Sequence, residues 1–532
     1  MPRLPLLLSF LLLSIVLTAQ KNSPQSLPTS DEEARELAAT ITVEDLTRHL
    51  TIISADDMEG RETGQAGQKK AMAYLKGEFQ RMGLPAIGDH DDYYQRIVFS
   101  RQKWEKVDLK FEGESLRHLW EYASPPSGND SREEISINEL TFLGYGIDDP
   151  AYSDYKDNDV KGKHLLILAG EPKAKSGNYL VSGSPEKSDW SNSTERKLEV
   201  AKEKGAATVF VIDPEFKTNV RDIRKETLDG RMKMAESTEA DRTTANVVYI
   251  TPQLAKKIMG KAGKKIIKAR KKLEKSGKLR PVTIPTDLKL TQKKAVRELI
   301  GENVLGFVEG SDPVLKDEVL VVSAHYDHIG RRGDAIFNGA DDNGSGTSTV
   351  LEVAEAFVTA QKQGKGPRRS VLFLLVSGEE KGLLGSEYYA SHPVFPIANT
   401  IADINVDMVG RVDDKHQDNP EYIYVIGSDR LSSELHDINE RMNQTFTKLE
   451  LDYTYNAEDD PNRYYYRSDH YNFAEKGIPS IFFFNGTHDD YHMDTDTIEK
   501  INFEKMAKIG QLVFHTAWQL ANQDRRIVVD VK

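Results

Sequence analysis

The sequence contains no cysteine. This absence excludes disulfide bonds, thiolate metal ligands, a cysteine nucleophile and a lipid anchor attached to an N-terminal cysteine. A chain of 532 residues does not need disulfides, because it is long enough to bury more than one hydrophobic core. Any metal site in this chain has to be built from histidines and carboxylates.

Positive charge is also in short supply. The chain has 71 lysines and arginines against 84 aspartates and glutamates, which gives a net charge of -13. Because phosphate binding draws on clustered positive charge, we expect no nucleic-acid partner. One stretch, residues 255–280, is strongly basic and could dock on an anionic surface. Its apolar residues also fit one face of an amphipathic helix with lysines in solvent, which is the interpretation we favour.

No hydrophobic run reaches the roughly 20 residues that a membrane-spanning helix needs. The apolar run from Leu4 to Leu17 follows one arginine and is followed by "LTAQ" and a polar stretch. This pattern is typical of a secretory signal peptide that is cut near Ala19 or Gln20. We therefore predict a signal peptide over residues 1–20, and a mature protein that is secreted or periplasmic and free of the membrane.

The texture of the sequence changes along the chain and predicts an α/β fold with an insertion. After Pro281, near-continuous apolar runs alternate with helical stretches, which indicates a mostly parallel sheet sandwiched by helices. Earlier, short β-like runs separated by polar loops indicate a smaller β-rich α/β domain. The predicted parts are a loose leader (21–40), a larger domain (41–115 and 290–525), the inserted domain (116–289) and a C-terminal tail (526–532).

Histidines and carboxylates follow the ends of the predicted buried strands, where ligands bind in open α/β sheets. In chain order they are His325, Asp327, Asp341, Asp342, Glu379, Glu380, Asp407, His488 and His492. Taken singly, a histidine at a strand end is more often structural, and "ADDNGSG" could be a simple turn. Their joint occurrence on successive strand ends predicts a site for zinc or another divalent metal.

Five motifs carry a family resemblance: "AHYDHIG", "NGADDNGSG", "SGEEKGLLGS", "NVDMVG" and "DDYH". Together they resemble the co-catalytic di-zinc aminopeptidase family, metallopeptidase family 28, with relatives such as bacterial leucyl aminopeptidases and glutamate carboxypeptidase II. The stretches "FLGYGI" and "YKDNDVKGKHLLILAGEP" resemble the protease-associated domain inserted in many members. The resemblance implies a peptidase domain of the zinc aminopeptidase fold over 41–115 and 290–525, and a protease-associated domain over 116–289.

The resemblance also implies the ligands of two Zn²⁺ ions per chain. His325 and Asp407 would bind one zinc, Glu380 and His492 the other, and Asp341 would bridge both. Five protein ligands leave coordination positions for a shared water, as an open catalytic site needs. The family's unusual cis peptide after the bridging aspartate would lie at Asp341–Asp342. Asp327 would orient the imidazole of His325.

Two adjacent glutamates receive separate roles from the same resemblance. Glu380 would hold zinc, while Glu379 would accept a proton from the bridging water and pass it to the leaving amine. Tyr491 would lie near the oxyanion, with a packing tyrosine as the alternative. Arg467 would meet a substrate carboxylate or, equally, form a structural salt bridge. "MDTDT" after His492 departs from the threonine that relatives often have there, so contacts around this ligand stay open.

The function that this reasoning predicts is an exported di-zinc exopeptidase acting on peptides, in the first place an aminopeptidase. A carboxypeptidase acting on acidic peptides is the nearest alternative, and it would need a basic substrate pocket. Two further alternatives share the fold: a non-catalytic binding relative and a cyclase acting on N-terminal glutamine. The complete set of predicted metal ligands favours a peptidase over both. The ligand types also admit cobalt or manganese in place of zinc. Side-chain preference and oligomeric state are not indicated by the sequence.

Overall fold

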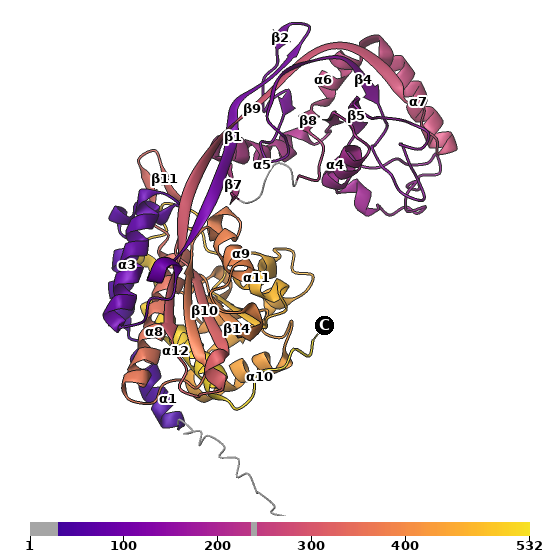
Figure 1. The fold of residues 1–532 in the computed structure, drawn as a ribbon. Coiled ribbons are helices and arrows are strands. Elements are labelled where there is room, and N and C mark those ends of the chain that lie inside the picture. Colours follow the sequence, from indigo (N-terminus) through magenta and orange to yellow (C-terminus); the bar gives the residue numbers. More distant parts are fainter. Residues whose placement is uncertain (1–29, 236–241, 532) are drawn as a thin grey trace, which may run out of the picture.

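The computed structural model describes residues 30–235 and 242–531 and has two lobes joined by a long two-stranded ribbon (Figure 1). The predicted signal peptide lies outside the described residues. Among the helices that are described, none is long and apolar enough to cross a membrane.

The larger lobe is built on a sheet with the strand order β16-β15-β17-β14-β10-β13-β9. Its strands are β9 (Val282–Val308), β10 (Val319–His325), β13 (Ser370–Val376), β14 (Thr400–Val406), β15 (Tyr422–Ile426), β16 (Glu450–Asp452) and β17 (Ser480–Phe484). The central strands β13, β10, β14 and β17 are parallel, whereas β9 and β15 run antiparallel to β13 and β17. The four central strands are fully buried, which explains their continuous apolar sequences and confirms the predicted fold class.

Helices cover both faces of this sheet. The helices that share the main core are α1 (Asp31–Ala38), α2 (Val43–Ile53), α3 (Ala66–Met82), α8 (Gly346–Lys362), α10 (Ser433–Met442) and α12 (Phe503–Asn522). The opposite face is covered by α9 (Leu384–Ser391) and α11 (His470–Glu475), through Tyr389 and Phe473. A small hairpin of β11 (Gly330–Arg332) and β12 (Ala335–Phe337) stands beside the carboxyl end of β10.

The prediction of a loose leader over residues 21–40 is wrong for its second half. Ser30 and Glu33 form a capping box that starts α1, and Leu37 of this helix is 3% exposed in the main core. Burying one such leucine contributes about 1.5–3 kcal/mol, so this helix is part of the folded lobe. At the other end, Ile527 of the predicted tail is also buried in this core.

The smaller lobe continues the same hydrogen-bonded sheet in the order β9-β4-β5-β6-β8-β3. Its strands are β2 (Glu114–Ser115), β3 (Tyr122–Ala123), β4 (Arg132–Phe142), β5 (His164–Leu168), β6 (Thr208–Ile212), β7 (Arg231–Met234) and β8 (Val247–Ile250). Its helices are α4 (Thr194–Glu203), α5 (Phe216–Asp229), α6 (Pro252–Met259) and α7 (Gly263–Ser276). One core packs α4 against the sheet, and a second packs α6 and α7.

Two long antiparallel strands, β9 and β1 (Tyr94–Phe111), connect the lobes (Figure 1). Strand β9 has 27 residues, which corresponds to about 90 Å at about 3.3 Å per residue. The predicted domain boundary at residue 289 falls inside this continuous strand, because β9 pairs with β4 at one end and with β13 at the other. The assignment of the smaller lobe to a protease-associated domain stays a prediction.

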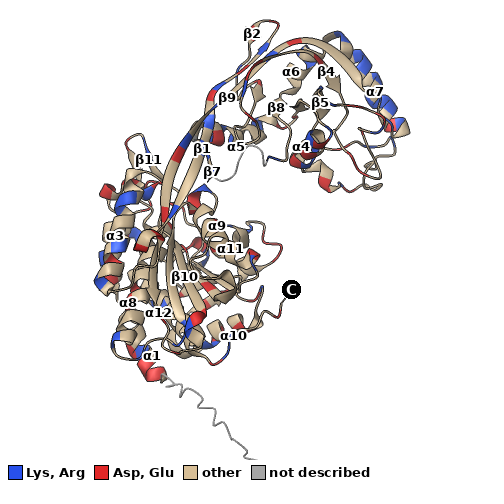
Figure 2. Cartoon of the chain, in the orientation of Figure 1, with Lys and Arg blue, Asp and Glu red and all other residues tan. Residues whose placement is uncertain are grey.

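The basic stretch 255–280 forms α6 and α7, which Gly260 separates at a positive φ of 41°. Ile258 and Ile266 are buried as predicted, whereas Ile267 is 56% exposed. Figure 2 shows the lysines and arginines of α7 along the outside of the smaller lobe. The interpretation as an amphipathic helix with solvated lysines therefore holds.

Candidate active site

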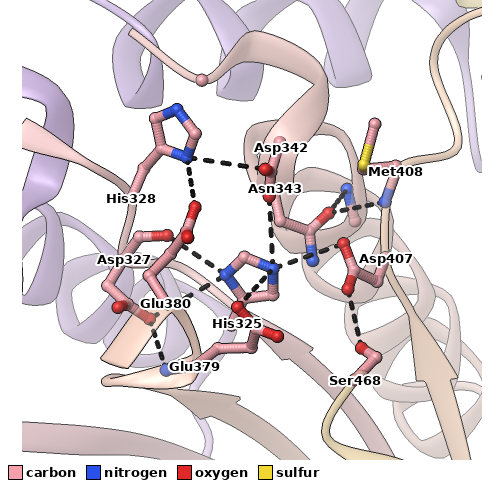
Figure 3. A network of polar contacts seen from close by, with 12 residues as sticks. His325, Asp327, His328, Asp342, Asn343, Glu379, Glu380, Asp407, Met408 and Ser468 are labelled. Atoms are coloured by element: carbon pink, nitrogen blue, oxygen red, sulfur yellow. Dashed lines mark hydrogen bonds and ion pairs between the residues drawn. The ribbon is translucent and has the colours of Figure 1, made fainter. Parts of the chain in front are cut away.

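The register of the parallel strands brings the predicted site residues together at one edge of the larger sheet (Figure 3). Ser323 of β10 lies opposite Asn405 of β14, so His325 and Asp407, each two residues further on, come side by side. His325 itself lies opposite Val376 of β13, and the chain turns from there into Glu379. Because the three strands are neighbours, their carboxyl ends form one pocket for ligands.

A first group of potential metal ligands consists of His325, Asp342 and Asp407. The Nε2 atom of His325 lies 3.3 Å from Oδ1 of Asp407 and 3.5 Å from Oδ1 of Asp342. The second oxygen of Asp407 accepts a hydrogen bond of 2.6 Å from the hydroxyl of Ser468. All three side chains of the group are buried, and Ser468 fixes the orientation of one of them.

A second group consists of His328, Asp342 and Glu380. The Nδ1 atom of His328 lies 2.8 Å from Oε1 of Glu380. His492 is close to the same group, with Nε2 at 3.1 Å from Oδ2 of Asp342 and at 3.3 Å from Oε2 of Glu380. Asp342 thus belongs to both groups and presents one carboxylate oxygen to each.

The structure corrects the bridging residue by one position. Asp341, predicted to bridge, accepts hydrogen bonds from the backbone N–H of Gly410 (2.7 Å) and the hydroxyl of Ser345 (3.0 Å). Its other oxygen lies 3.2 Å from Nε2 of His488. The carboxylate of Asp341 is therefore occupied with holding the surrounding loops, and Asp342 occupies the shared position. The cis peptide likewise lies at Asp342–Asn343 and not at Asp341–Asp342.

Two side chains hold the loop that presents Asp342. The carboxylate of Asp496 accepts the backbone N–H groups of Asp341 at 3.0 Å and of Asp342 at 3.1 Å. The amide of Asn343 accepts from the backbone of Met408 at 3.1 Å and donates to the carbonyl of Val406 at 2.9 Å. The loop is thereby tied to the end of β14, the strand that carries Asp407.

The donor set fits a bound divalent cation. Four carboxylates, those of Asp342, Glu379, Glu380 and Asp407, converge, and no lysine or arginine within residues 30–235 or 242–531 forms an ion pair with any of them. The buried Arg61 nearby donates to carbonyl oxygens instead. Buried carboxylates without compensating cations are costly unless they are paired or bind metal.

The orientation of His328 points the same way. Neither of its ring nitrogens makes a hydrogen bond, although Nδ1 is only 2.8 Å from Glu380. Oε1 of Glu380 also lacks a hydrogen-bond partner. The two atoms are therefore aimed at a common point and not at each other, as ligands of one ion are. Imidazole with carboxylate and no thiolate suits zinc or a similar divalent metal.

The pKa values of the two adjacent glutamates, Glu379 and Glu380, are shifted in opposite directions. Burial raises the pKa of Glu379 well above its usual range, and the carboxylates around it add to the shift, although His325 opposes it. Burial would also raise the pKa of Glu380, but the adjacent imidazoles of His328 and His492 outweigh this effect and hold the pKa well below its usual range. One carboxylate is thus poised to take up a proton and its neighbour to stay ionised.

Asp327 does not orient His325 in the way that was predicted. Nδ1 of His325 lies 3.1 Å from the backbone carbonyl oxygen of Asp327 but 3.9 Å from its carboxylate. The carboxylate of Asp327 instead accepts the hydroxyl of Thr63 at 2.6 Å and the backbone N–H of Glu379 at 3.2 Å. The backbone of Asp327 thus faces the histidine, while its side chain positions the turn that carries Glu379.

A small cavity of about 30 Å³ opens on the His325 side of the two groups. The ring of Tyr491 stacks on His492 with 3.9 Å between the centroids, and its hydroxyl accepts from Arg467 at 3.5 Å. The guanidinium of Arg467 also lies over the ring of Tyr464. The apolar part of the lining comes from Met408, Phe482 and Phe484.

Three residues of the site, His328, Asp496 and Ser468, were missed in the sequence, whereas Asp342 was named there without its bridging role. His328 stands inside the "HYDH" motif, one residue after Asp327, and its proximity to His325 was the signal for it. Asp342 could not be separated from Asp341 by spacing alone. Asp496 lies in "MDTDT" and Ser468 in "RSDH". Nothing in these motifs indicates the hydrogen bonds that the two residues form with the site, because those bonds arise only in the folded chain.

Residues 303–517 match the family model of Peptidase family M28. This part of the chain belongs to peptidase family M28. The M28 region contains every residue of the two groups and His492.

Curated relatives of the M28 region include a "Probable leucine aminopeptidase" of Arthroderma otae, 34% identical over 218 residues, or 39% of this chain and 56% of the relative. "Aminopeptidase YwaD" of Bacillus subtilis is 26% identical over 240 residues, or 44% of this chain and 48% of the relative. The chain spans about half the length of the curated relatives it matches.

Among solved structures, "Aminopeptidase from Aneurinibacillus sp. strain AM-1" aligns over 94% of this chain and 98% of its own. The TM-score is 0.55 at 19% sequence identity. This likeness shows that the fold, including both lobes, is shared with that protein.

Proposed function

We propose that the chain is a metal-dependent aminopeptidase that hydrolyses peptides at their N-terminal residue. The observation that carries the proposal is the shared position of Asp342 between two buried groups of histidine and carboxylate, with Glu379 beside them. The two curated relatives of the M28 region described above are named aminopeptidases, which supports the same function.

The two groups would hold two divalent ions, with zinc as the first choice. His325, Asp342 and Asp407 would bind one ion, and Asp342, Glu380 and His492 the other, with His328 facing Glu380 as a further donor. Ions bound there would polarise the peptide carbonyl and make water more acidic.

Glu379 is the general base of the proposed reaction. Its carboxylate lies 3.9 Å from Nε2 of His325, beside the first group and outside both sets of ligands. It would take a proton from the water that attacks the scissile carbonyl and deliver this proton to the amine as the C–N bond breaks. The raised pKa of Glu379 favours proton uptake, and the carboxylate of Asp327 holds its backbone in place.

The space around the site favours an exopeptidase. On the His325 side, the small cavity of about 30 Å³ has room for little more than water or a small side chain. On the side of Glu380 and His492, a cleft of about 490 Å³ has room for the rest of a peptide. An extended peptide thus fits on only one side of the two groups of potential metal ligands. This arrangement suits a substrate whose terminal residue is bound at the site.

The prediction that the protein is exported rests on the sequence of residues 1–20 alone. Under this proposal the mature protein begins near residue 20 or 21. N-terminal sequencing of material recovered outside the cytoplasm would show this start, and an intact Met1 would contradict it.

Mass-spectrometric digestion of a peptide panel tests the proposed function. Each peptide is supplied free and N-acetylated, with and without a chelator. Release of N-terminal residues from free peptides only, abolished by the chelator and restored by zinc, is the expected result. Loss of C-terminal residues would instead make the enzyme a carboxypeptidase. Absence of any cleavage by protein with metal bound would contradict a peptidase.

A further inference from the structure

The cleft on the Glu380 side is formed by both lobes. One wall comes from α5 and β7 of the smaller lobe, and the other from the β11–β12 hairpin of the larger lobe. Glu380, Lys381 and His492 line it at the metal groups. A substrate whose first residue is held at the metal groups therefore has to pass its remaining residues between the two lobes.

The wall from the smaller lobe is held firmly against the site. Strand β7 pairs antiparallel with β1, with Met234 opposite Phe99. Met232 of this strand is 5% exposed and packs in a cluster with Phe99 and Leu384, which begins the helix after the glutamate turn. The smaller lobe thus presents Arg231, the first residue of β7, at a defined place in the cleft.

Basic side chains dominate the lining, although the whole chain has a net charge of -13. They are Arg101, Lys225, Arg231, Arg332 and Lys381. Among the described residues, two acidic side chains line the cleft away from the candidate metal ligands, and both are engaged. Glu62 is shared by Arg101 at 3.8 Å, Arg332 at 3.6 Å and Lys381 at 3.3 Å.

The other acidic side chain, Glu226, accepts a hydrogen bond from the backbone of Ser127. Lys225 and Arg231 are exposed, and neither forms an ion pair with another described residue. Arg332 and Lys381 share Glu62, and Lys225 and Arg231 are two further cations, so the described residues give the cleft an excess of positive charge. Such a cleft attracts anionic groups and orders a carboxylate by charge-assisted hydrogen bonds.

We propose that this cleft binds a carboxylate of the substrate within a few residues beyond the scissile bond. The inference rests on the proposed function and names its substrate class: short peptides with a free C-terminal carboxylate, or peptides with an acidic residue after the first. A peptide advances by about 3.3–3.6 Å per residue, so the carboxylate of a tripeptide falls within a cleft of this size. Arg231 and Lys225 are the specificity-determining residues.

The experiment compares pairs of tripeptides that differ in one charge. Ala-Gly-Gly is used as free acid and as amide, and Ala-Asp-Gly amide is compared with Ala-Asn-Gly amide. The ratio of kcat/KM within each pair is measured for the zinc-loaded wild type, for the double variant Lys225→Gln/Arg231→Gln and for Arg231→Lys. Arg224→Gln is the matched control, because Arg224 is the exposed neighbour of Lys225 on α5 and lies outside the cleft lining.

Binding of the same peptides is measured in parallel by calorimetry in the full-length Glu379→Gln background, where turnover is slow. The wild type should prefer the charged member of at least one pair by a factor on the order of ten, since hydrogen bonds to charged groups are the strong ones. The double variant should lose this preference, while Arg231→Lys and Arg224→Gln keep it. Added salt should weaken it because the cleft is open to solvent.

The outcomes separate the two proposals. Preference in the acid and amide pair assigns the cleft to the C-terminal carboxylate, and preference in the Asp and Asn pair assigns it to an acidic side chain. Charge-selective binding together with no hydrolysis by the zinc-loaded wild type would overturn the proposed function but support the binding of a carboxylate in the cleft. Equal handling of both members of both pairs would overturn the inference, as would equal losses in the double variant and in Arg224→Gln.

Discussion

Two regions of the larger lobe gather a buried histidine and carboxylates, but they balance the charge in different ways. The first is the candidate active site around Asp342. The second is a group of His49, Glu352 and Glu355 between α2 and α8. Both satisfy the simplest distance criterion for a metal site, so distance alone does not distinguish a binding site from a structural network.

The His49 group is neutralised by the chain itself. Nε2 of His49 accepts from the guanidinium of Arg48 at 3.0 Å, and Nδ1 lies 2.7 Å from the hydroxyl of Tyr74. Glu355 is held by two hydrogen bonds from Arg81. Both histidine nitrogens are therefore occupied, and cationic side chains stand where an ion would have to bind.

At the candidate active site no arginine or lysine of the described chain pairs with the converging carboxylates, and His328 has no hydrogen bond. The contrast teaches that converging carboxylates without a lysine or arginine partner mark a candidate metal site, whereas a structural network carries its own cations, here Arg48 and Arg81. The following predictions test this contrast, from the largest expected effect to the smallest.

Glu379→Gln should lower kcat by a factor of about 10² to 10⁴ while the protein keeps its metal. The reason is that Glu379 moves the proton but is not among the ligand groups. Steady-state kinetics and metal analysis of the same preparation provide the measurement. A variant with near-normal turnover would remove Glu379 as the general base.

Asp342→Asn should lose high-affinity binding of both ions, because its carboxylate is shared by the two groups. Asp341→Asn is the matched control, one residue away and equally buried. It should still bind two ions per chain but unfold at a lower temperature, since its hydrogen bonds to Ser345 and Gly410 are weakened. Native mass spectrometry and thermal unfolding distinguish the two variants. The opposite pattern would restore the original assignment of the bridge to Asp341.

His492→Ala should lose the second ion, and His328→Ala should weaken metal binding by a factor of about 10 to 100. Both imidazoles reach Glu380, but His492 also lies 3.1 Å from Asp342. Competition for zinc with a chromogenic chelator gives the affinities. Unchanged zinc affinity in His328→Ala would mean that this histidine only packs beside the site.

The His49 group should respond to pH and not to metal. Burial raises the pKa of Glu352 to about 8 and lowers that of His49 to about 4. Between pH 6.5 and 8 the unfolded chain has released the proton of Glu352 while the folded chain still holds it. Stability should therefore fall as the pH rises through this window, by at most about 1.4 kcal/mol per pH unit. Below pH 6.5 the opposite shift of His49 offsets the effect.

Glu352→Gln should remove this slope without changing the number of bound ions. Thermal unfolding of the wild type and the variant at pH 6.5, 7.2 and 8.0 provides the check. Identical slopes for the two proteins would contradict the acidity assigned to Glu352.

Much of the fold and of the site could be predicted from the sequence. Parallel buried strands leave continuous apolar runs, and the residues at their ends, such as His325, Glu380 and Asp407, mark the ligand edge. The smaller lobe and its approximate extent also followed from the change in texture. The length of β9 could not be predicted, because its middle is exposed and resembles a polar linker in sequence.

The errors share a physical cause. Asp341 and Asp342 are identical in chemistry, and only the path of the loop, held by Asp496 and Asn343, decides which carboxylate turns inward. The role of Asp327 changed because its backbone, and not its side chain, faces His325. Which carboxylate or carbonyl group faces the site depends on the conformation of individual residues. Hydrophobic patterns and motif spacing do not predict that conformation.

The central claim is tested most directly by counting zinc ions per chain in the wild type, Asp342→Asn and Glu352→Gln by native mass spectrometry. The account predicts two ions in the wild type and in Glu352→Gln, and fewer than two in Asp342→Asn. Two ions in Asp342→Asn, or the loss of an ion in Glu352→Gln, would contradict it.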